Sequence, residues 1–237
     1  MMKPCYLIAE MSANHAGDLS RALEIVHAAK EAGADCIKTQ TYTADTLTID
    51  CANDYFSIHE GPWKGRTLYD LYQEAHTPWA WLVRIKEEAD KLGLDYLSTP
   101  FDRTAVDFLA ELGVSSYKVA SFELNDLPLL HYIAAQGKPV IASTGMASLG
   151  EIERAVRTVR EAGNPDLCLL KCSSAYPAPP DDMNLRTIPH LAETFGVAVG
   201  LSDHTLGSAS AVAAVVLGAC VIEKHFCLSR SITNPDA

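Results

Sequence analysis

Residues 197–226 have the sequence VAVGLSDHTLGSASAVAAVVLGACVIEKHF, which contains one complete strand–helix–strand unit. Two short β-rich runs, 197–203 and 221–226, flank a stretch of helical period over 208–218 that ends at Gly218. Each short run is continuously apolar until its last residues, a pattern typical of strands buried on both faces of a parallel sheet. The unit therefore predicts an α/β fold with parallel strands.

The same alternation runs through the rest of the chain. Further strands are predicted over 6–10, 36–40, 96–100, 116–121, 139–144 and 167–174, and helices over 19–33, 78–93, 104–113, 127–137, 148–163 and 185–196. Strands that alternate with helices in this way predict a closed TIM (β/α)8 barrel. An open doubly wound sheet is the alternative, but no GxGxxG follows the first strand, which disfavours a dinucleotide-binding version. No linker interrupts the pattern, so residues 1–237 are predicted to form a single catalytic domain.

One long insertion departs from this rhythm. Between Gln40 and Thr77 the only clean helical pattern is TLYDLYQEAH, residues 67–76. Long insertions on the strand-to-helix side of a barrel are usually functional loops. We therefore expect residues 41–76 to lie at the end of the barrel where the strands finish.

Composition excludes several classes of protein. The chain has 19 Lys and Arg against 30 Asp and Glu, a formal net charge of −11, which disfavours nucleic acid and anionic membranes as partners. The longest apolar run, 211–222, is too short to cross a bilayer. The seven cysteines are scattered without a CxxC pair, which predicts reduced thiols and a cytoplasmic protein.

Polar residues gather where the predicted strands end, and in a parallel barrel these ends form the active-site face. Two lysines and four hydroxyl residues have the chemistry to surround a phosphate or a carboxylate. They are Lys38, Lys118, Thr99, Ser121, Ser143 and Ser202. The alternative is that each lysine only pairs with a carboxylate inside the barrel.

Two histidines and three carboxylates accompany them. His204 and His225 follow neighbouring strands about 4.8 Å apart, so both imidazoles can reach one Mn²⁺, Zn²⁺ or Fe²⁺ ion. Glu10, Glu123 and Asp236 could orient sugar hydroxyls or act as acid or base. The alternatives are histidines that are merely hydrogen-bonded, and carboxylates that form ion pairs with the two lysines.

Several ungapped motifs together resemble the sialic acid synthase family, whose enzymes condense phosphoenolpyruvate with an amino sugar. The motifs include AEMSANHAG (9–17), GADCIKTQTYTADTLTID (33–50), YKVASFE (117–123), KCSSAYPAPPDDMNL (171–185), GLSDHTLG (200–207) and IEKHF (222–226). The insertion is most similar to the pseudaminic acid branch of that family. The resemblance therefore implies 2,4-diacetamido-2,4,6-trideoxy-L-altrose as the acceptor sugar. N-Acetylneuraminate and legionaminate synthases have the same chemistry and remain alternatives.

The resemblance also implies a cofactor and a set of site residues. It implies a divalent metal, usually Mn²⁺ with Mg²⁺ or Co²⁺ possible, held by His204 and His225. Glu10 and Glu123 take the catalytic roles. The residues implied to bind substrate are Lys38, Thr99, Lys118, Ser121, Ser143, Ser174, Tyr176, Ser202 and Asp236. Position 174 is Asn in some members of the family.

One feature departs from the family pattern. Members usually carry a C-terminal antifreeze-like domain, but here 237 − 225 leaves twelve residues after His225. We therefore expect no such domain, and scarcely any room for the last barrel helix. The apolar surface that this would expose favours a homodimer. Further alternatives are a barrel that binds ligand without turnover and, less favoured, a class II aldolase.

Overall fold

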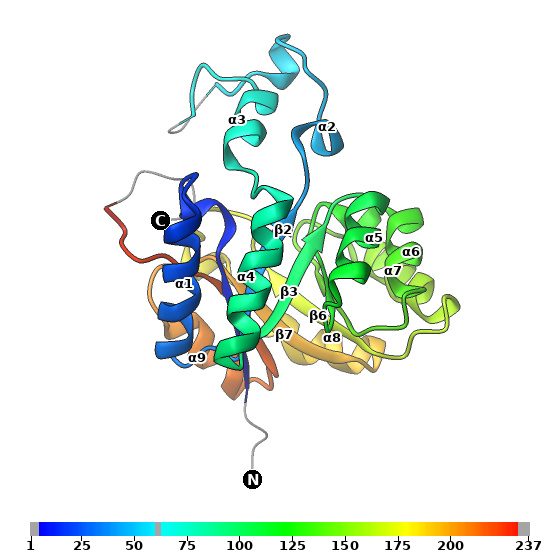
Figure 1. Ribbon diagram of the computed structural model, residues 1–237. Coiled ribbons are helices and arrows are strands. Elements are labelled where there is room, and N and C mark those ends of the chain that lie inside the picture. The colour runs from blue at the N-terminus through cyan, green and yellow to red at the C-terminus, as the bar shows by residue number, and fades with distance from the viewer. Residues whose placement is uncertain (1–4, 60–62, 232–237) are drawn as a thin grey trace.

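A computed structural model describes residues 5–59 and 63–231 of the chain. Its parallel strands close into one barrel, in sequence order (Figure 1). The strands are β1 (Tyr6–Glu10), β2 (Cys36–Thr41), β3 (Asp95–Pro100), β4 (Tyr117–Val119), β5 (Val140–Ser143), β6 (Leu167–Cys172), β7 (Ala198–Asp203) and β8 (Val221–His225). β8 pairs with β1 in a register that puts His225 beside Glu10. This closing pair confirms the TIM barrel and excludes the open sheet.

Helices surround the barrel and connect successive strands. They are α1 (Leu19–Glu31), α4 (Trp79–Leu92), α5 (Arg103–Leu112), α6 (Leu127–Ala134), α7 (Leu149–Glu161), α8 (Thr187–Phe195) and α9 (Ala209–Val216). Their ends follow from local chemistry. The Asp18 carboxylate accepts hydrogen bonds from the first-turn amides of α1, and Gly113 ends α5 in the left-handed conformation with φ 75°. Pro78 was predicted to open α4, but it precedes the helix, which begins at Trp79.

Apolar side chains fill two separate layers. One cluster lies between the strands and the helices, and a smaller one lies inside the barrel. The inner cluster consists of Ile8, Cys36, Leu97, Ile141, Leu170 and Val221. Since side chains alternate along a strand, the residues two positions further on also face inward. These residues are Glu10, Lys38, Thr99, Ser143, Cys172 and Glu223, so the interior changes from apolar to polar toward the C-terminal ends of the strands.

The insertion projects beyond this polar end (Figure 1). It contains α2 (Ala44–Leu47), the 3₁₀ turn η2 (Asp54–Phe56) and α3 (Leu68–Ala75), and the last of these matches the helical pattern predicted over 67–76. The Tyr42 ring packs edge-on against Tyr72, with centroids 6.0 Å apart, and against Phe101, with centroids 5.4 Å apart. These contacts connect the insertion to the barrel.

Two expectations from the sequence concern the outside of the barrel: the last barrel helix and the exposure of apolar surface. Among residues 226–231, the described part of the chain beyond β8, no helix is formed. Val212 and Val216 on α9 are exposed. No helix built by residues 5–59 and 63–231 is both long and apolar enough to span a bilayer.

A buried histidine predicts a pH-dependent stability. His15, in the 3₁₀ turn η1 (Ser12–His15), accepts a hydrogen bond at Nδ1 from the Gly17 amide and contacts the Thr77 hydroxyl through Nε2 at 3.0 Å. Burial, assisted by the charge of His76, lowers its pKa from 6.5 to about 4. Unfolding therefore takes up a proton between these two values. We expect the free energy of unfolding to fall by about 3 kcal/mol as the pH drops through that window, and to be fully retained above it.

Urea denaturation across this pH range measures the effect. His15→Gln should lose most of the slope in this window. The matched change His27→Gln, at a half-exposed histidine paired with Glu88, should keep it. An unchanged slope in His15→Gln would contradict the assignment.

Candidate functional site

A cavity opens at the C-terminal end of the barrel, above the polar inner layer. It is lined by Lys38, Gln40, Thr99, Phe101, Lys118, Ala120, Ser121, Phe122, Ser143, Cys172, Ser174, Tyr176, Ser202, His204, Glu223 and His225. Every residue predicted to bind substrate or metal is in this set except Asp236, which lies outside the described residues. The two predicted catalytic carboxylates, Glu10 and Glu123, do not line this cavity.

Three buried charges, those of Lys38, Lys118 and Glu223, lie in the floor of the cavity, and a fourth, that of Glu10, lies directly behind Lys38. Lys38 pairs with Glu10 and lies 3.4 Å from Glu223, measured from Nζ to Oε1. Lys118 lies 3.8 Å from the same Glu223 oxygen. The ion-pair alternative for Glu10 and the two lysines is therefore what the structure contains. Two ammonium groups are balanced by two carboxylates, so an incoming anion meets a group of charges that is neutral overall.

Burial and neighbouring charges shift the pKa values of this group in different directions. For Lys118 burial dominates and lowers the pKa, because the ammonium loses its hydration. For Lys38 burial acts in the same direction, but the two carboxylates of Glu10 and Glu223 together outweigh it and the pKa is raised. Burial disfavours ionisation of Glu223, yet the two ammonium groups outweigh it and lower its pKa. The opposite charges of Lys38 and Glu223 thus stabilise each other's ionised form.

Hydroxyl groups complete the floor, and two polar atoms there have no partner. Lys118 donates to the Ser143 hydroxyl at 2.7 Å. Thr99 Oγ1 and Glu223 Oε2 are buried without any hydrogen-bond partner among the described residues. A buried polar atom without a partner costs free energy unless a ligand or water satisfies it. Thr99 Oγ1 and Glu223 Oε2 therefore have unused hydrogen-bonding capacity that a polar ligand or water in the cavity could satisfy.

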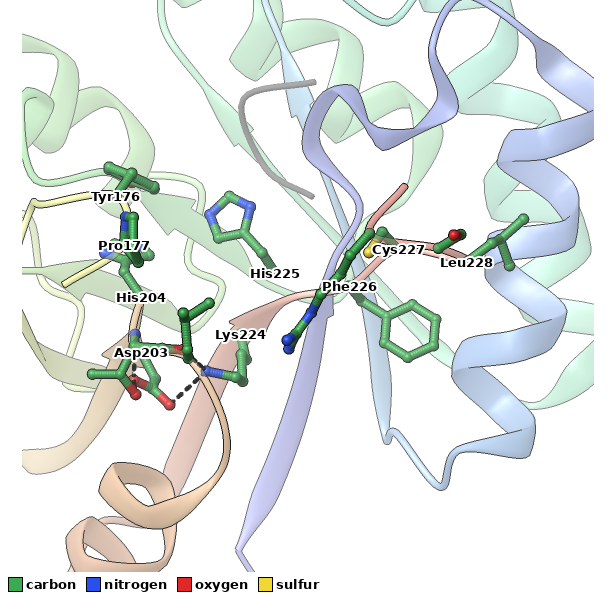
Figure 2. A pocket seen from close by; sticks show the side chains of 13 residues that line it. Tyr176, Pro177, Asp203, His204, Lys224, His225, Phe226, Cys227 and Leu228 are labelled. Carbon is green, nitrogen blue, oxygen red and sulfur yellow. Dashed lines mark hydrogen bonds and ion pairs between the residues drawn. The ribbon is translucent and has the colours of Figure 1, made fainter. Parts of the chain in front are cut away.

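His204 and His225 lie at the rim, with ring centroids 5.4 Å apart. Tyr176 stacks on His204 at 4.2 Å and contacts the edge of His225 at 5.6 Å. Figure 2 shows the His225 imidazole turned toward Tyr176 and His204, whereas the neighbouring Lys224 points toward Asp203. The alternation along β8 explains this difference, because successive side chains face opposite sides of the sheet.

The separation of the imidazoles fits a shared cation. Two neutral imidazoles on neighbouring strands, this close together, could each offer one ring nitrogen to the same divalent ion. The observed separation is 5.4 Å. His204 Nδ1 lies 2.9 Å from the Ser173 carbonyl, which can only accept, so Nδ1 carries the proton and Nε2 keeps its lone pair for a ligand. Among the described residues no group of three His, Cys, Asp or Glu side chains is arranged to hold a metal.

Glu123 lies in the 3₁₀ turn η3 (Glu123–Asn125), where the chain leaves β4. The strand was predicted to run to Ser121, but it ends at Val119. Leaving the sheet early lets the Ser121 hydroxyl accept a hydrogen bond from the Gly145 amide at 3.0 Å. Glu123 Oε2 is buried without a partner among the described residues, and burial raises the pKa of the carboxyl.

A larger hollow of about 510 Å³ adjoins the first, and Figure 2 shows it. Tyr176, His204 and His225 line both spaces. The remaining lining comes from Pro177, from the end of β7 and the loop after it, from Lys224 on β8, and from residues 226–230, including Arg230. The imidazoles therefore lie between a small charged pocket and a wider one that can hold a larger molecule.

The sequence analysis assigned no site role to three polar residues of the cavity: Gln40, Cys172 and Glu223. Gln40 donates to Glu10 at 3.1 Å. Burial alone raises the pKa of the Cys172 thiol, but its hydrogen bonds, chiefly with His204, lower it to about 7. All three are in phase with the inward-facing residues of their strands, and this period-two pattern could have identified them.

Gly145 is predicted to be essential for the shape of the pocket. A Cβ at this position would lie 2.3 Å from Ser174 Oγ and 2.8 Å from Ser121 Oγ. Gly145→Ala should therefore displace both hydroxyls, weaken binding of an anionic ligand about tenfold by the loss of a charge-assisted hydrogen bond, and lower the free energy of unfolding by only about 1 kcal/mol. Gly150→Ala, where a Cβ meets no atom within 4 Å, is the matched control. Titration calorimetry with phosphoenolpyruvate measures the effect, and equal affinities in the two variants would contradict it.

Similarity to known proteins extends over nearly the whole chain. A family model described as the NeuB family matches residues 25–237. The pseudaminic acid synthase of Campylobacter jejuni strain 81-176 is 48% identical over 235 residues, which are 99% of this chain and 68% of the relative. The N,N'-diacetyllegionaminic acid synthase of Legionella pneumophila is 42% identical over 98% of this chain and 66% of the relative.

A solved structure has the same fold. The N-acetylneuraminic acid synthetase of Leptospira borgpetersenii, crystallised in complex with citrate, superposes with a TM-score of 0.87 and 33% identity. The match covers 97% of this chain and 75% of that one.

Proposed function

This chain belongs to the NeuB family, and we therefore propose that it is a phosphoenolpyruvate-dependent synthase that makes pseudaminic acid. The membership confirms the family resemblance of the motifs. The proposed reaction joins phosphoenolpyruvate, 2,4-diacetamido-2,4,6-trideoxy-L-altrose and water to give pseudaminic acid and phosphate. The observation that carries the proposal is the charged, hydroxyl-lined pocket next to a pair of imidazoles, at one mouth of the barrel.

The charged pocket suits the anionic substrate. Lys38 and Lys118 offset the negative charge of phosphoenolpyruvate, and Lys118 orients the Ser143 hydroxyl as a donor. Thr99 Oγ1 is available as a further donor, since it has no partner among the described residues. Because Glu10 and Glu223 already balance the lysines, additional positive charge at the rim favours binding.

His204 and His225 are the proposed ligands of a divalent metal, Mn²⁺ being the expected ion. Bound there, the ion supplies Lewis-acid polarisation of the sugar aldehyde and the missing positive charge. Tyr176 packs against both imidazoles. Residues 226–230 and Tyr176 border the wider hollow, which is the proposed place for the acceptor sugar.

The bond changes follow from this placement. C3 of phosphoenolpyruvate attacks C1 of the open-chain sugar, and the new C–C bond leaves positive character at C2. Water adds at C2, and the resulting tetrahedral centre releases phosphate by cleavage of its C–O bond. Glu10 and Glu123 are the proposed proton carriers. Glu123 suits an acid role because burial raises its pKa.

An assay of phosphate release tests the proposal. The protein is incubated with Mn²⁺, phosphoenolpyruvate and, separately, the diacetamido-altrose, the legionaminic acid precursor or N-acetylmannosamine. We expect turnover to be fastest with the first sugar. Faster turnover with the second would favour the activity named for the Legionella relative. Binding of phosphoenolpyruvate without phosphate release from any sugar would favour a barrel without turnover.

The setting of the enzyme is part of the proposal. None of the seven cysteines, all in the described part of the chain, forms a disulfide, which supports a reducing compartment, and the cytoplasm is the proposed location. A homodimer is the proposed assembly, supported by the exposed valines of α9. Sedimentation analysis at several protein concentrations measures it.

A further inference from the structure

Lys171 is a buried lysine that the proposed chemistry does not use. It lies near the end of β6, only 8% exposed, and it does not line the cavity of the proposed site. The ion pairs of the described residues do not include it. Burial of an ammonium group without a close carboxylate is costly, and burial is also the main reason that its pKa is lowered. The buried ammonium of Lys171 therefore needs a structural role that offsets this cost.

The Lys171 ammonium holds the turn that follows β6. Its Nζ donates to the Ser173 hydroxyl at 2.5 Å and to the Cys172 carbonyl at 3.2 Å. The Ser173 hydroxyl in turn donates to the Asp182 carbonyl at 3.0 Å, across the loop that precedes α8. The peptide that follows β6 is therefore held by hydrogen bonds from Lys171, which does not line the cavity.

This arrangement fixes the carbonyl that contacts His204. Lys171 Nζ donates to the Cys172 carbonyl and to the Ser173 hydroxyl, which directly precede the Ser173 carbonyl along the chain, so one ammonium restrains the segment that presents this carbonyl. Ser173 O lies 2.9 Å from His204 Nδ1. Because the carbonyl can only accept, this contact selects the tautomer with the proton on Nδ1 and leaves the Nε2 lone pair free.

We propose that Lys171 is a positioning residue for His204, acting through Ser173 to set the orientation and tautomer of that imidazole. The assignment of His204 as a metal ligand rests on the proposed function, but the tautomer does not. Partners that orient a ligating histidine typically contribute 10–100-fold to metal affinity. Lys171 therefore affects metal binding without touching metal or substrate.

Two measurements on Lys171→Met test the inference. In metal-free ¹⁵N-labelled protein, at a pH where the imidazoles are neutral, long-range ¹H–¹⁵N spectra report which nitrogen of His204 carries the proton. The His204→Asn spectrum assigns the signals. We expect the Nδ1–H tautomer in the wild type, a mixture of tautomers in Lys171→Met, and a Kd for Mn²⁺ about 10–100-fold higher in that variant.

Matched variants make the outcome decisive. Lys138→Met removes an ammonium that donates to the Val114 carbonyl at 2.5 Å, also outside any described ion pair, and it should leave the tautomer and the Kd unchanged. Ser173→Ala keeps the carbonyl, removes only the hydroxyl and should shift the tautomer in the same direction by less, so it decides the question if Lys171→Met does not fold.

Other outcomes overturn the inference. These are an unaltered tautomer in Lys171→Met, or in Ser173→Ala where Lys171→Met does not fold, and an equal change in Lys138→Met. If the wild type binds no Mn²⁺, the proposed function fails, while the tautomer spectra still decide the role of Lys171.

Discussion

His204→Ala is expected to abolish stable binding of a divalent metal and to lower synthase turnover about 1000-fold. The imidazole is one of the two proposed nitrogen ligands at the rim, and the described residues offer no third His, Cys, Asp or Glu side chain to replace it. Loss of Lewis-acid stabilisation is worth several kcal/mol, which corresponds to that factor in rate. Metal content after dialysis and phosphate release from phosphoenolpyruvate measure the two effects.

The matched control is His27→Ala, at a half-exposed histidine on α1 that pairs with Glu88. It should retain both metal and activity. His225→Ala should behave like His204→Ala, because the two rings share the proposed ion. Both rim variants should remain folded, since neither side chain belongs to the hydrophobic core clusters. Wild-type metal content in His204→Ala would contradict the ligand assignment.

The barrel and its charged mouth could be predicted because both depend on local periodicity. The C-terminal ends of parallel strands meet on one face of the barrel. Lys38, Lys118, His204 and His225 could therefore be predicted from the positions of the strand ends, without knowledge of the register between strands. The same periodicity places Glu223 inside, two residues before His225 and two after Val221. The inward position of Glu223 is therefore predictable from the sequence pattern alone.

The partners of these residues could not be predicted from periodicity. The Glu10–Lys38 ion pair depends on the register between β1 and β2, in which these two residues are neighbours. The contact between Ser173 and His204 depends on a loop conformation set by Lys171 and Asp182. The early end of β4 has the same origin, because the chain leaves the sheet to meet the Gly145 amide. Register and loop conformation are tertiary properties that a single sequence leaves open.

Lys118→Met is expected to have the second large effect, on both ligand binding and stability. The ammonium is buried, donates to Ser143 at 2.7 Å and faces Glu223 at 3.8 Å. Its loss leaves two carboxylates with only Lys38 between them. Removing one partner from a buried charge group costs about 3–5 kcal/mol in the free energy of unfolding. Affinity for phosphoenolpyruvate should fall at least about 30-fold, because truncating a buried, hydrogen-bonded charge costs about 2–5 kcal/mol of binding.

The double variant Lys118→Met/Glu223→Gln separates the two effects. It removes one charge of each sign, so the remaining Lys38 and Glu10 balance, and urea denaturation should show most of the lost stability restored. Binding of phosphoenolpyruvate, followed by titration calorimetry, should stay weak because the donor to the anion is still missing. Lys138→Met, far from the cavity, controls for the loss of an ammonium group. If the double variant regains wild-type affinity, Lys118 acts only by neutralising Glu223 and does not bind the substrate.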